Sequence, residues 1–184
     1  MASKPRLLLH ICCGPCATSV VERLRRDYEI VGYWDNPNVQ PAEEHERRLE
    51  AARRFATQAG FELVVAPYDP EPWEEAVRGL EDEPEGGRRC AVCYRLRLGA
   101  AAAEAVRRGA THLATTLTIG PQKKAAVINP LGEAAAGAHG LTFVAEDFKK
   151  RAGLERSIEL SRQHDLYRQG YCGCLYARRR QARL

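Results

Sequence analysis

Short apolar runs alternate with longer amphipathic segments along this chain. The runs 6–11, 30–34, 61–66, 112–117 and 141–145 are rich in aliphatic and aromatic residues, and each has the length of a buried strand. The segments between them place apolar residues at helical spacing, with arginine and glutamate on the other positions. Strands that alternate with helices predict a parallel sheet with helices on both faces, a Rossmann-like α/β fold. The whole chain, 1–184, is expected to form one domain.

The amphipathic segments also predict which helix faces are buried. For the helix that opens at Pro41 and ends at Gly60, the expected buried face is Leu49, Ala52, Ala56 and Ala59. For the long helix that follows Cys93, it is Leu96, Ala100, Ala103 and Val106. The acidic, Gly- and Pro-rich stretch 81–87 is expected to be a loop, and the small residues of 132–140 to form a permissive segment.

Residues with reactive, metal-binding or hydrogen-bonding side chains gather at or just after the expected strand ends. In parallel α/β sheets the functional crevice lies outside the carboxyl ends of the strands. The sequence therefore predicts one site around a set of strand-end residues. These are Cys12, Cys13, Asp35, Tyr68, Asp69, Thr115, Thr116 and Asp147.

Composition narrows the class of protein. The net charge of +4 is mildly basic, which is compatible with a nucleic-acid partner. The first residues are polar, and no segment has the ~20 apolar residues of a membrane span, so we expect a cytoplasmic protein without a membrane partner. Thiols stay reduced in that compartment, so seven cysteines indicate metal or redox chemistry rather than a disulfide scaffold.

Three clusters contain all seven cysteines. The first, Cys12-Cys13-Gly14-Pro15-Cys16, follows a strand and opens a helix, where the helix dipole favours thiolates. The others are Cys90-x-x-Cys93 and Cys172-Gly-Cys174. A large thiolate-ligated cluster uses seven sulfurs better than one zinc ion does. We expect the adjacent side chains of Cys12 and Cys13 to diverge, which suits two neighbouring metal centres.

Two other classes compete with a metal-dependent reductase. Cys13-Gly14-Pro15-Cys16 has the spacing of a thioredoxin motif, in which Cys13 would attack a disulfide and Cys16 would resolve it. Against this, Cys12 stands where an aromatic residue is expected, and the other four cysteines would have no role. The third class is an RNA-binding module stabilised by zinc.

Several motifs occur together, in order, over nearly the whole chain. They are Leu9-His10-Ile11-Cys12-Cys13-Gly14-Pro15-Cys16, Asn36-Pro37-Asn38-Val39-Gln40-Pro41 with Arg47-Arg48, Arg89-Cys90-x-x-Cys93 with Arg95-Leu96, Thr115-Thr116-Leu117, Glu146-Asp147-Phe148-Lys149-Lys150, and Leu166-Tyr167-Arg168-Gln169-x-Tyr171-Cys172-Gly173-Cys174. This combination resembles the QueH-type epoxyqueuosine reductases. Trp34, Gln40, His45 and the loop 120–123 depart from the family pattern.

The resemblance implies an enzyme that reduces epoxyqueuosine to queuosine at the wobble position of tRNA, in the last step of queuosine biosynthesis. It implies a 4Fe–4S cluster with an adjacent iron, an external electron donor, and the fold of the ATP pyrophosphatases. The Ser-Gly-Gly-x-Asp-Ser loop of a tRNA thiolase is absent, so ATP use is not expected.

Removing an epoxide oxygen requires two electrons and protons. The cysteines are the expected metal ligands, and several residues are candidate proton donors. The candidates are His10, Asp35, Tyr68, Asp147 and Tyr167, of which His10 is the most easily explained as a core residue.

The expected tRNA contacts are basic clusters that bind phosphates and one aromatic platform for a base. The candidate platforms are Trp34, Tyr33, Tyr68 and Tyr167. For Trp34 and Tyr33 a core position is equally compatible with the sequence. The basic residues are Arg88, Arg89, Lys123, Lys124, Lys149, Lys150, Arg151, Arg178, Arg179 and Arg180.

Overall fold

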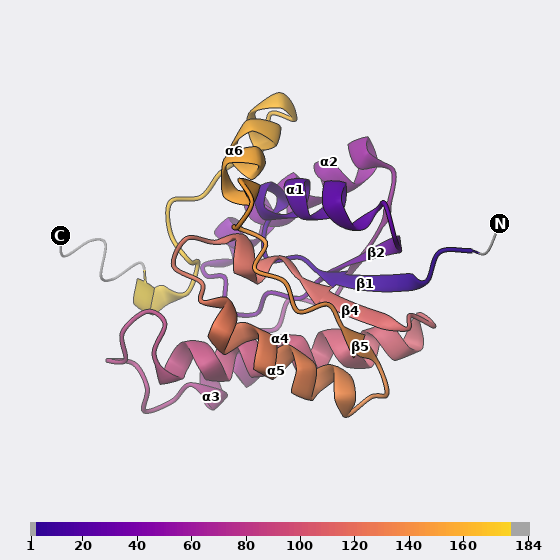
Figure 1. Ribbon diagram of the computed structural model, residues 1–184. Helices are drawn as coiled ribbons and strands as arrows, with labels where there is room; N and C mark the ends of the chain where they lie inside the picture. Colours follow the sequence, from indigo (N-terminus) through magenta and orange to yellow (C-terminus); the bar gives the residue numbers. More distant parts are fainter. Residues whose placement is uncertain (1–2, 178–184) are drawn as a thin grey trace.

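Five parallel strands form the central sheet of the computed structural model, which describes residues 3–177 (Figure 1). The strands are β1 (Arg6–His10), β2 (Glu29–Trp34), β3 (Glu62–Val65), β4 (His112–Thr115) and β5 (Thr142–Phe143). Their order is β3-β2-β1-β4-β5, with Leu8 of β1 paired to Val31 of β2 and to Leu113 of β4. The predicted parallel α/β fold is confirmed.

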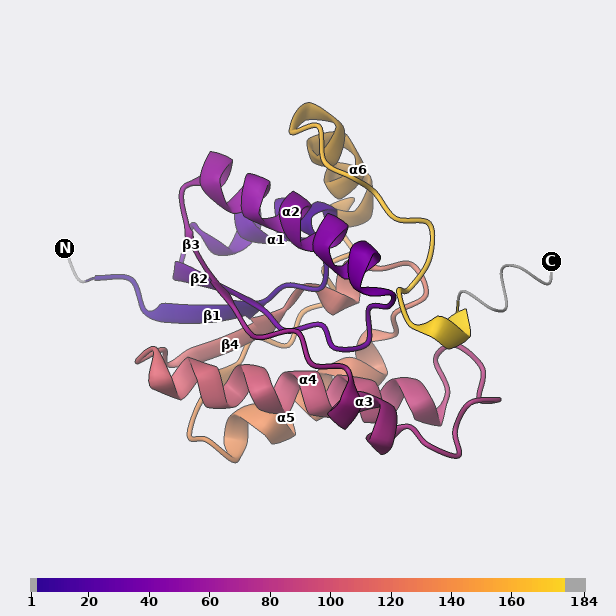
Figure 2. The ribbon, with the colours of Figure 1, turned by 180° about the vertical axis from the view of Figure 1, so that it is seen from behind.

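Helices cover both faces of this sheet. One face carries α1 (Gly14–Leu24), α2 (Ala42–Ala59) and α6 (Gly153–Gln163). The other carries α4 (Arg88–Arg107) and α5 (Ala125–Gly137), with the short α3 (Glu71–Ala76) beside α4, as the two opposite views show (Figures 1 and 2). A 3₁₀ turn, η1 (Thr116–Ile119), follows β4 directly.

The central strand explains why both faces need a helix layer. Leu7 and Leu9 pack among residues of α1 and α2, while Leu8 packs against the alanines of α4. All three leucines are fully buried. Side chains alternate between the faces of a strand, so three consecutive leucines indicate a strand that is covered on both sides.

The predicted inner face is right for α2 and wrong for α4. Leu49, Ala52 and Ala56 are buried, as expected. In α4 the buried residues include Leu98, Ala101, Ala102 and Ala105, whereas Leu96 and Val106 are 39% and 50% exposed. An alanine-rich helix has no single dominant apolar stripe, and the small alanine side chains allow α4 to lie close to the sheet.

Two other helix predictions change. The helix α4 begins at Arg88, so Cys90 and Cys93 lie inside its first turns rather than before it. The helix α5 continues to Gly137, through residues expected to be a permissive segment. A Cβ at Gly132 would lie 2.2 Å from the ring of Phe143, so this glycine allows α5 to pack closely on β5.

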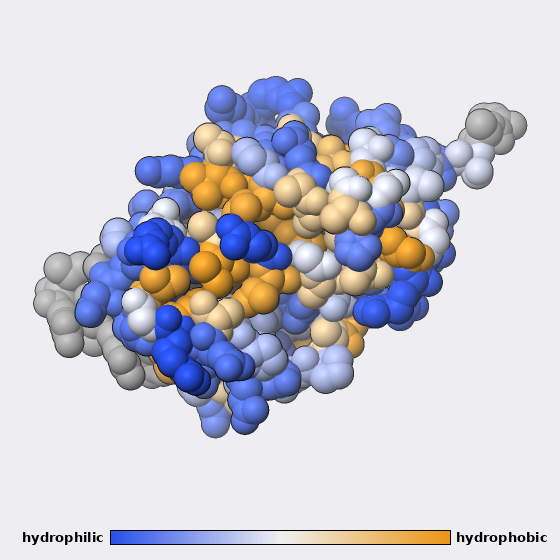
Figure 3. Space-filling view, turned by 90° about the horizontal axis from the view of Figure 1, so that it is seen from below, coloured by the Kyte–Doolittle hydropathy of each residue, from blue (hydrophilic) through white to orange (hydrophobic). Residues whose placement is uncertain are grey.

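The surface carries mixed polar and apolar areas. On the side seen from below, apolar surface is interrupted by strongly hydrophilic side chains (Figure 3). Within residues 3–177, no helix combines the length and apolar character that a membrane span requires.

Candidate metal centre

The turn between β1 and α1 holds the first three cysteines. Cys13 precedes the helix, and its sulfur accepts a hydrogen bond from the backbone N–H of Cys16 at 3.1 Å. Thr116, at the end of the neighbouring strand, accepts from the Cys12 N–H at 3.0 Å and donates to the Cys12 sulfur at 3.2 Å. The sheet order therefore fixes this turn, because β4 lies directly beside β1.

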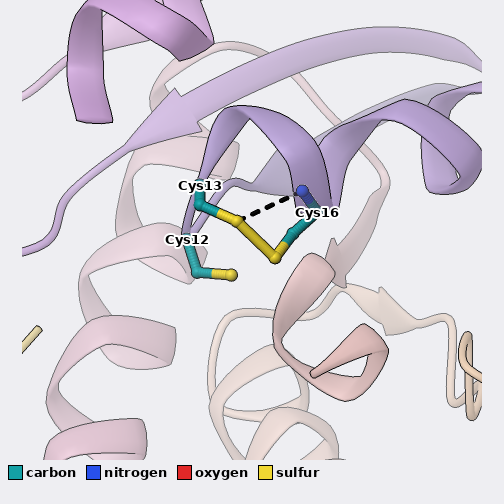
Figure 4. Close-up of side chains that lie close together, drawn as sticks. All are labelled: Cys12, Cys13 and Cys16. Carbon is teal, nitrogen blue, oxygen red and sulfur yellow. Dashed lines mark hydrogen bonds between the residues drawn. A yellow bond between two sulfur atoms is a disulfide. The ribbon is translucent and has the colours of Figure 1, made fainter. Parts of the chain in front are cut away.

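The three sulfurs of this turn converge. The Sγ atoms of Cys12, Cys13 and Cys16 all lie within 4.8 Å of one another, and Figure 4 shows them on the same side of the turn. The expectation that the Cys12 and Cys13 side chains diverge is therefore wrong. The extended backbone at Cys13, with φ −164° and ψ 155°, aligns its side chain with the helix start.

The structure also joins Cys13 and Cys16 by a disulfide, which the metal interpretation did not predict (Figure 4). A separation of three residues across the first helical turn brings the two sulfurs together. Cys12, Cys90, Cys93, Cys172 and Cys174 are free thiols.

The second pair of cysteines comes from the start of α4. Both Cys90 and Cys93 are 7% exposed. The sulfur of Cys90 accepts from the Gly86 N–H at 3.2 Å, and Cys12 packs against the same apolar cluster as Cys90. The Cys93 sulfur lies 3.9 Å from the guanidinium of Arg97, one helical turn later.

The third pair comes from the segment after α6, which is anchored by Arg48 of α2. This buried guanidinium donates to the carbonyls of Cys172 at 3.0 Å and Tyr171 at 3.2 Å. Gly173 has a φ of +107°, which favours glycine, and a Cβ there would lie 2.7 Å from the Arg48 Nη1. The glycine between the two cysteines therefore allows both a sharp turn and a close approach to Arg48.

The three cysteine clusters meet in space. Cys93 packs in one apolar cluster with Cys172 and Cys174, while Cys12 packs beside Cys90. The charge of Arg97 interacts with the sulfurs of Cys93, Cys12 and Cys172, which belong to three different segments.

The environment favours a thiolate at Cys172. A hydrogen bond from Cys174 has the largest effect, and the ammonium of Lys123, 3.1 Å from the sulfur, adds to it. Together they hold the pKa of the Cys172 thiol well below its usual range. The same hydrogen bond, with burial, raises the pKa of Cys174, and burial raises the pKa of Cys93.

This donor set fits an iron–sulfur centre. Soft thiolates are the ligands of such centres, and here they come from three segments around two cationic side chains, Arg97 and Lys123. Cys13 and Cys16 offer sulfur ligands only after their disulfide has been reduced. The three sulfurs of the first turn already lie within reach of a common group.

Gly14 is needed for this arrangement, and replacing it tests the geometry of the turn. A Cβ on Gly14 would lie 2.7 Å from the backbone C and O of Ala51 in α2. We expect Gly14→Ala to destabilise the metal-free chain by about 1–3 kcal/mol through overpacking, and to lower its iron content after reconstitution. Thermal unfolding and iron analysis measure both effects.

Gly99→Ala is the matched control, because a Cβ at Gly99 in α4 meets nothing within 4 Å. It is expected to retain full iron binding and to gain up to about 1 kcal/mol from helix propensity. Equal stability and equal iron content in the two variants would contradict the close approach of α1 to α2.

A cavity of about 440 Å³ opens beside the sulfurs. Cys12, Cys16 and Cys172 are the cysteines in its wall. Glu85 is the one carboxylic acid among the described residues that line it. The other polar lining residues are Asn38, Arg48, Arg97, Gln122, Lys123, Ser157, Arg168, Gln169 and Tyr171.

None of the five expected proton donors lines this cavity. His10 is fully buried, its Nδ1 lies 2.8 Å from Thr115 Oγ1, and burial lowers its pKa well below the usual value. It is therefore a neutral core residue. Asp35 directly follows β2, and burial raises the pKa of its carboxyl group.

The remaining three candidates are occupied by structural contacts. Tyr68 donates to the Val39 carbonyl at 2.9 Å, and Tyr167 donates to the carboxylate of Glu44 at 3.2 Å. Asp147 forms an ion pair with Lys149 at 2.8 Å. The strand-end rule thus placed Cys12 at the cavity, whereas Asp35, Tyr68 and Asp147, which the same rule selected, are not among its lining residues.

Several expected RNA contacts point inward instead. Trp34 is fully buried and its indole N–H donates to His45 at 2.9 Å, so the core position applies and its ring offers no face to a base. Arg89 is 2% exposed and donates to three carbonyls of the loop 80–83.

Two lysines of the expected set also have internal roles. Lys123 contacts the sulfur of Cys172 and pairs with Glu85 at 3.2 Å. Lys149 donates to the carbonyls of Thr118 and Lys123, which braces the loop before α5. Long aliphatic stems allow these cations to reach inward, so basic composition alone did not reveal their position.

The rest of the expected RNA contacts stay on the surface or lie outside the described part. Arg88, Lys124, Lys150 and Arg151 are exposed, and Arg151 pairs with Glu146 at 2.7 Å. Arg178, Arg179 and Arg180 lie outside the described residues.

Sequence reasoning missed Arg97 and Glu85 and assigned no role to Arg48. One signal for Arg97 was available: it follows Cys93 by four residues, which places both on one side of a helix. Nothing in the sequence distinguishes Glu85 from the other acidic residues of its loop.

Comparison with known proteins adds a family likeness that covers the whole site. The family model described as epoxyqueuosine reductase QueH matches residues 7–180. The chain is 38% identical to epoxyqueuosine reductase QueH from Streptococcus pyogenes serotype M1, over 97% of this chain and 72% of that protein. It is 33% identical to epoxyqueuosine reductase QueH from Thermotoga maritima, over 93% of this chain and 89% of that protein.

Solved structures with low sequence identity share the fold. U34-tRNA thiolase NcsA from Methanococcus maripaludis, solved with its 4Fe–4S cluster, superposes with a TM-score of 0.60 at 10% identity, covering 95% of this chain and 62% of that chain. A predicted subunit of a tRNA methyltransferase from Methanocaldococcus jannaschii gives a TM-score of 0.54 at 16% identity, over 81% of this chain and 74% of that chain. These likenesses confirm the predicted class of α/β fold, that of the ATP pyrophosphatases.

Proposed function

This chain belongs to the epoxyqueuosine reductase QueH family, and from that membership we propose that it reduces epoxyqueuosine in tRNA with electrons passed through its clustered cysteines. One observation carries the proposal: cysteines from two distant segments, Cys12 and Cys16 with Cys172, wall a single cavity. The reaction takes up two electrons and two protons, breaks both carbon–oxygen bonds of the epoxide, and releases one water to leave an alkene.

The cysteines are the proposed ligands of a 4Fe–4S cluster and an adjacent iron. Cys12, Cys13 and Cys16 supply sulfurs from the first turn, and Cys90, Cys93, Cys172 and Cys174 supply the others. Opening the Cys13–Cys16 disulfide takes two electrons and two protons and gives two thiols. When bound, such a centre supplies single-electron transfer and a Lewis acid beside the substrate.

The cavity suits one nucleoside rather than a helical RNA stem. Its volume of about 440 Å³ lies within the usual range for small-molecule sites, so the target nucleotide has to leave its stack to enter. Arg168 lines the cavity. Arg88, Lys124 and Lys150 are exposed, and each lies within a few residues of a lining residue along the chain. We propose that these four cations bind tRNA phosphates.

We propose that protons reach the departing oxygen through Glu85. Glu85 lines the cavity and its side chain is 35% exposed, so the carboxylate that pairs with Lys123 can take up a proton from water and pass it to the substrate. We expect Glu85→Gln to lower kcat by about 100-fold or more, which is the usual contribution of a general acid, with unchanged iron content. Single-turnover conversion of the tRNA under excess reductant measures the effect.

Glu133→Gln is the matched control, since Glu133 is exposed on α5 and absent from the cavity lining. It is expected to convert tRNA at the rate of the parent chain. An iron-loaded Glu85→Gln variant with the parent rate would exclude Glu85 from proton delivery.

The test of the proposed function uses anaerobically reconstituted protein, tRNA carrying epoxyqueuosine, and dithionite. Mass analysis of the tRNA nucleosides is expected to show loss of one oxygen atom from epoxyqueuosine. Protein that holds iron and acid-labile sulfide but causes no such loss would overturn the proposal.

The Cys13–Cys16 disulfide favours one second candidate, a thiol–disulfide oxidoreductase. In that case Cys13 would attack and Cys16 would resolve, without any metal. Reduction of a model disulfide by the metal-free chain, at a rate unaffected by changes at Cys90, Cys93, Cys172 or Cys174, would support that candidate.

Further components follow from the proposed reaction. An external low-potential donor has to supply the electrons, because the cysteine thiols, once oxidised, cannot reduce a second substrate molecule without one. We also propose that the protein works in the cytoplasm, where its thiols stay reduced.

A further inference from the structure

Arg97 is a buried cation at the centre of the cysteine clusters. It is 3% exposed and lies in α4, four residues after Cys93. Its Nη2 donates to the side-chain oxygen of Asn36, and its Nη1 lies 3.9 Å from the Cys93 sulfur. Its Nε is buried without a hydrogen-bond partner.

No carboxylate of the described residues lies within ion-pair distance of Arg97. Burying an unpaired cation is costly, and buried charges in proteins are normally compensated. The groups that act on it electrostatically are the sulfurs of Cys93, Cys12 and Cys172, and the carboxyl group of Asp35, which lies beyond ion-pair distance. The guanidinium is therefore matched to an anionic thiolate centre.

Asn36 fixes the position of this charge. Its side-chain N–H donates to the Ile11 carbonyl at 2.9 Å, directly before Cys12, while its oxygen receives the hydrogen bond from Arg97. Asn36 is 2% exposed, so the bridge is shielded from water. One neutral side chain thus connects the first cysteine turn to the helix that carries Cys93, and it adds no charge of its own beside Arg97.

Lys123 differs from Arg97 in this respect. It also contacts a cysteine sulfur, but Glu85 lies 3.2 Å from its ammonium and offsets its charge. Arg97 has no such ion-pair partner among the described residues, so its charge acts on the sulfurs with less offset than that of Lys123.

We propose that Arg97 is a positioning residue that raises the reduction potential of the iron–sulfur centre held by these cysteines. The inference rests on the proposed function, since it presumes that such a centre binds here. The step is the transfer of one electron from an external donor to the centre, with no bond formed or broken. Added negative charge is stabilised by a fixed cation in a low-dielectric interior and by N–H hydrogen bonds to sulfur.

Two variants remove the charge in different ways. Arg97→Gln deletes it, and Asn36→Asp retains Arg97 but gives it a carboxylate partner of nearly the same shape as the amide. Both are expected to lower the equilibrium constant for one-electron reduction at least tenfold, equivalent to a shift of about 59 mV to more negative potential. Arg97→Lys, which keeps the charge, is expected to retain most of the parent potential.

The measurement is a redox titration of the reconstituted full chain, followed by electron paramagnetic resonance at equal iron and sulfide content. Arg95→Gln is the matched control, because Arg95 is an exposed arginine on the same helix. Solvent screens its charge, so its loss is expected to leave the potential close to that of the parent.

The outcomes separate this inference from the proposed function. A parent chain that binds no iron–sulfur centre would overturn both. A parent potential retained in Asn36→Asp or in Arg97→Gln would overturn the role of Arg97 alone. If Arg97→Gln does not fold, Asn36→Asp against Arg97→Lys decides: a lower potential in the aspartate variant supports the inference, and equal potentials refute it.

Discussion

Replacing Cys172 by serine is expected to abolish the reduction of epoxyqueuosine while leaving the fold intact. Cys172 lies in the cavity wall, and Lys123 and Cys174 stabilise its thiolate. A serine hydroxyl has nearly the same size but stays protonated and binds iron poorly. Changes to groups that merely support a metal ligand cost 10–100-fold in affinity, so loss of the ligand itself is expected to cost about 100-fold or more. Iron and sulfide analysis after reconstitution, with tRNA conversion, measures the loss.

Cys172→Ser also separates the two candidate functions, because Cys172 is not part of the Cys13–Cys16 pair. A thiol–disulfide enzyme would lose activity in Cys13→Ser and keep it in Cys172→Ser, whereas a metal-dependent reductase is expected to lose activity in both. Thermal unfolding of the metal-free variants is the control for folding. Full tRNA conversion by Cys172→Ser would exclude Cys172 as a required ligand.

The fold was predictable because its main signals are local. Leu7-Leu8-Leu9 indicates a strand that is buried on both sides, and Gly60, with a φ of +69°, ends α2 at the expected residue. The face of α4 was not predictable, because three alanines, Ala101, Ala102 and Ala105, are among its buried residues and the larger Leu96 lies outside. Close packing of small side chains depends on the neighbouring helix and sheet, which the sequence does not specify locally.

The clustering of the cysteines could be predicted from the sequence, whereas the positions of their polar partners could not. Seven cysteines in three short motifs indicate one shared role, and the sheet brings Cys12 beside Thr116 as strand-end reasoning requires. The roles proposed for Arg97 and Glu85 depend instead on the direction in which the folded chain points these side chains. Arg97 turns into the interior and Arg95 turns outward, although both belong to the same helix.

Replacing Arg48 by methionine is expected to destabilise the segment that carries Cys172 and Cys174. Arg48 is 2% exposed, forms a 2.7 Å ion pair with Glu44, and donates to the carbonyls of Tyr171 and Cys172. Its loss leaves two carbonyls without their donor and the Glu44 carboxylate without its cationic partner. Removing one partner of a buried ion pair costs 3–5 kcal/mol, and Tyr167 still donates to Glu44, so we expect about 3 kcal/mol.

For a chain of this size, that loss corresponds to a fall in Tm of about 6–12 °C in the metal-free protein. Arg47→Met is the matched control, since the neighbouring Arg47 is exposed and its guanidinium only covers the Tyr167 ring at 3.7 Å. Arg48→Met is also expected to bind less iron than Arg47→Met, because Arg48 anchors the backbone on both sides of the Cys172 sulfur. A normal Tm with low iron content would show that Arg48 positions the cysteines without supporting the fold. Equal iron content in both variants would refute the anchoring role, whatever the change in Tm.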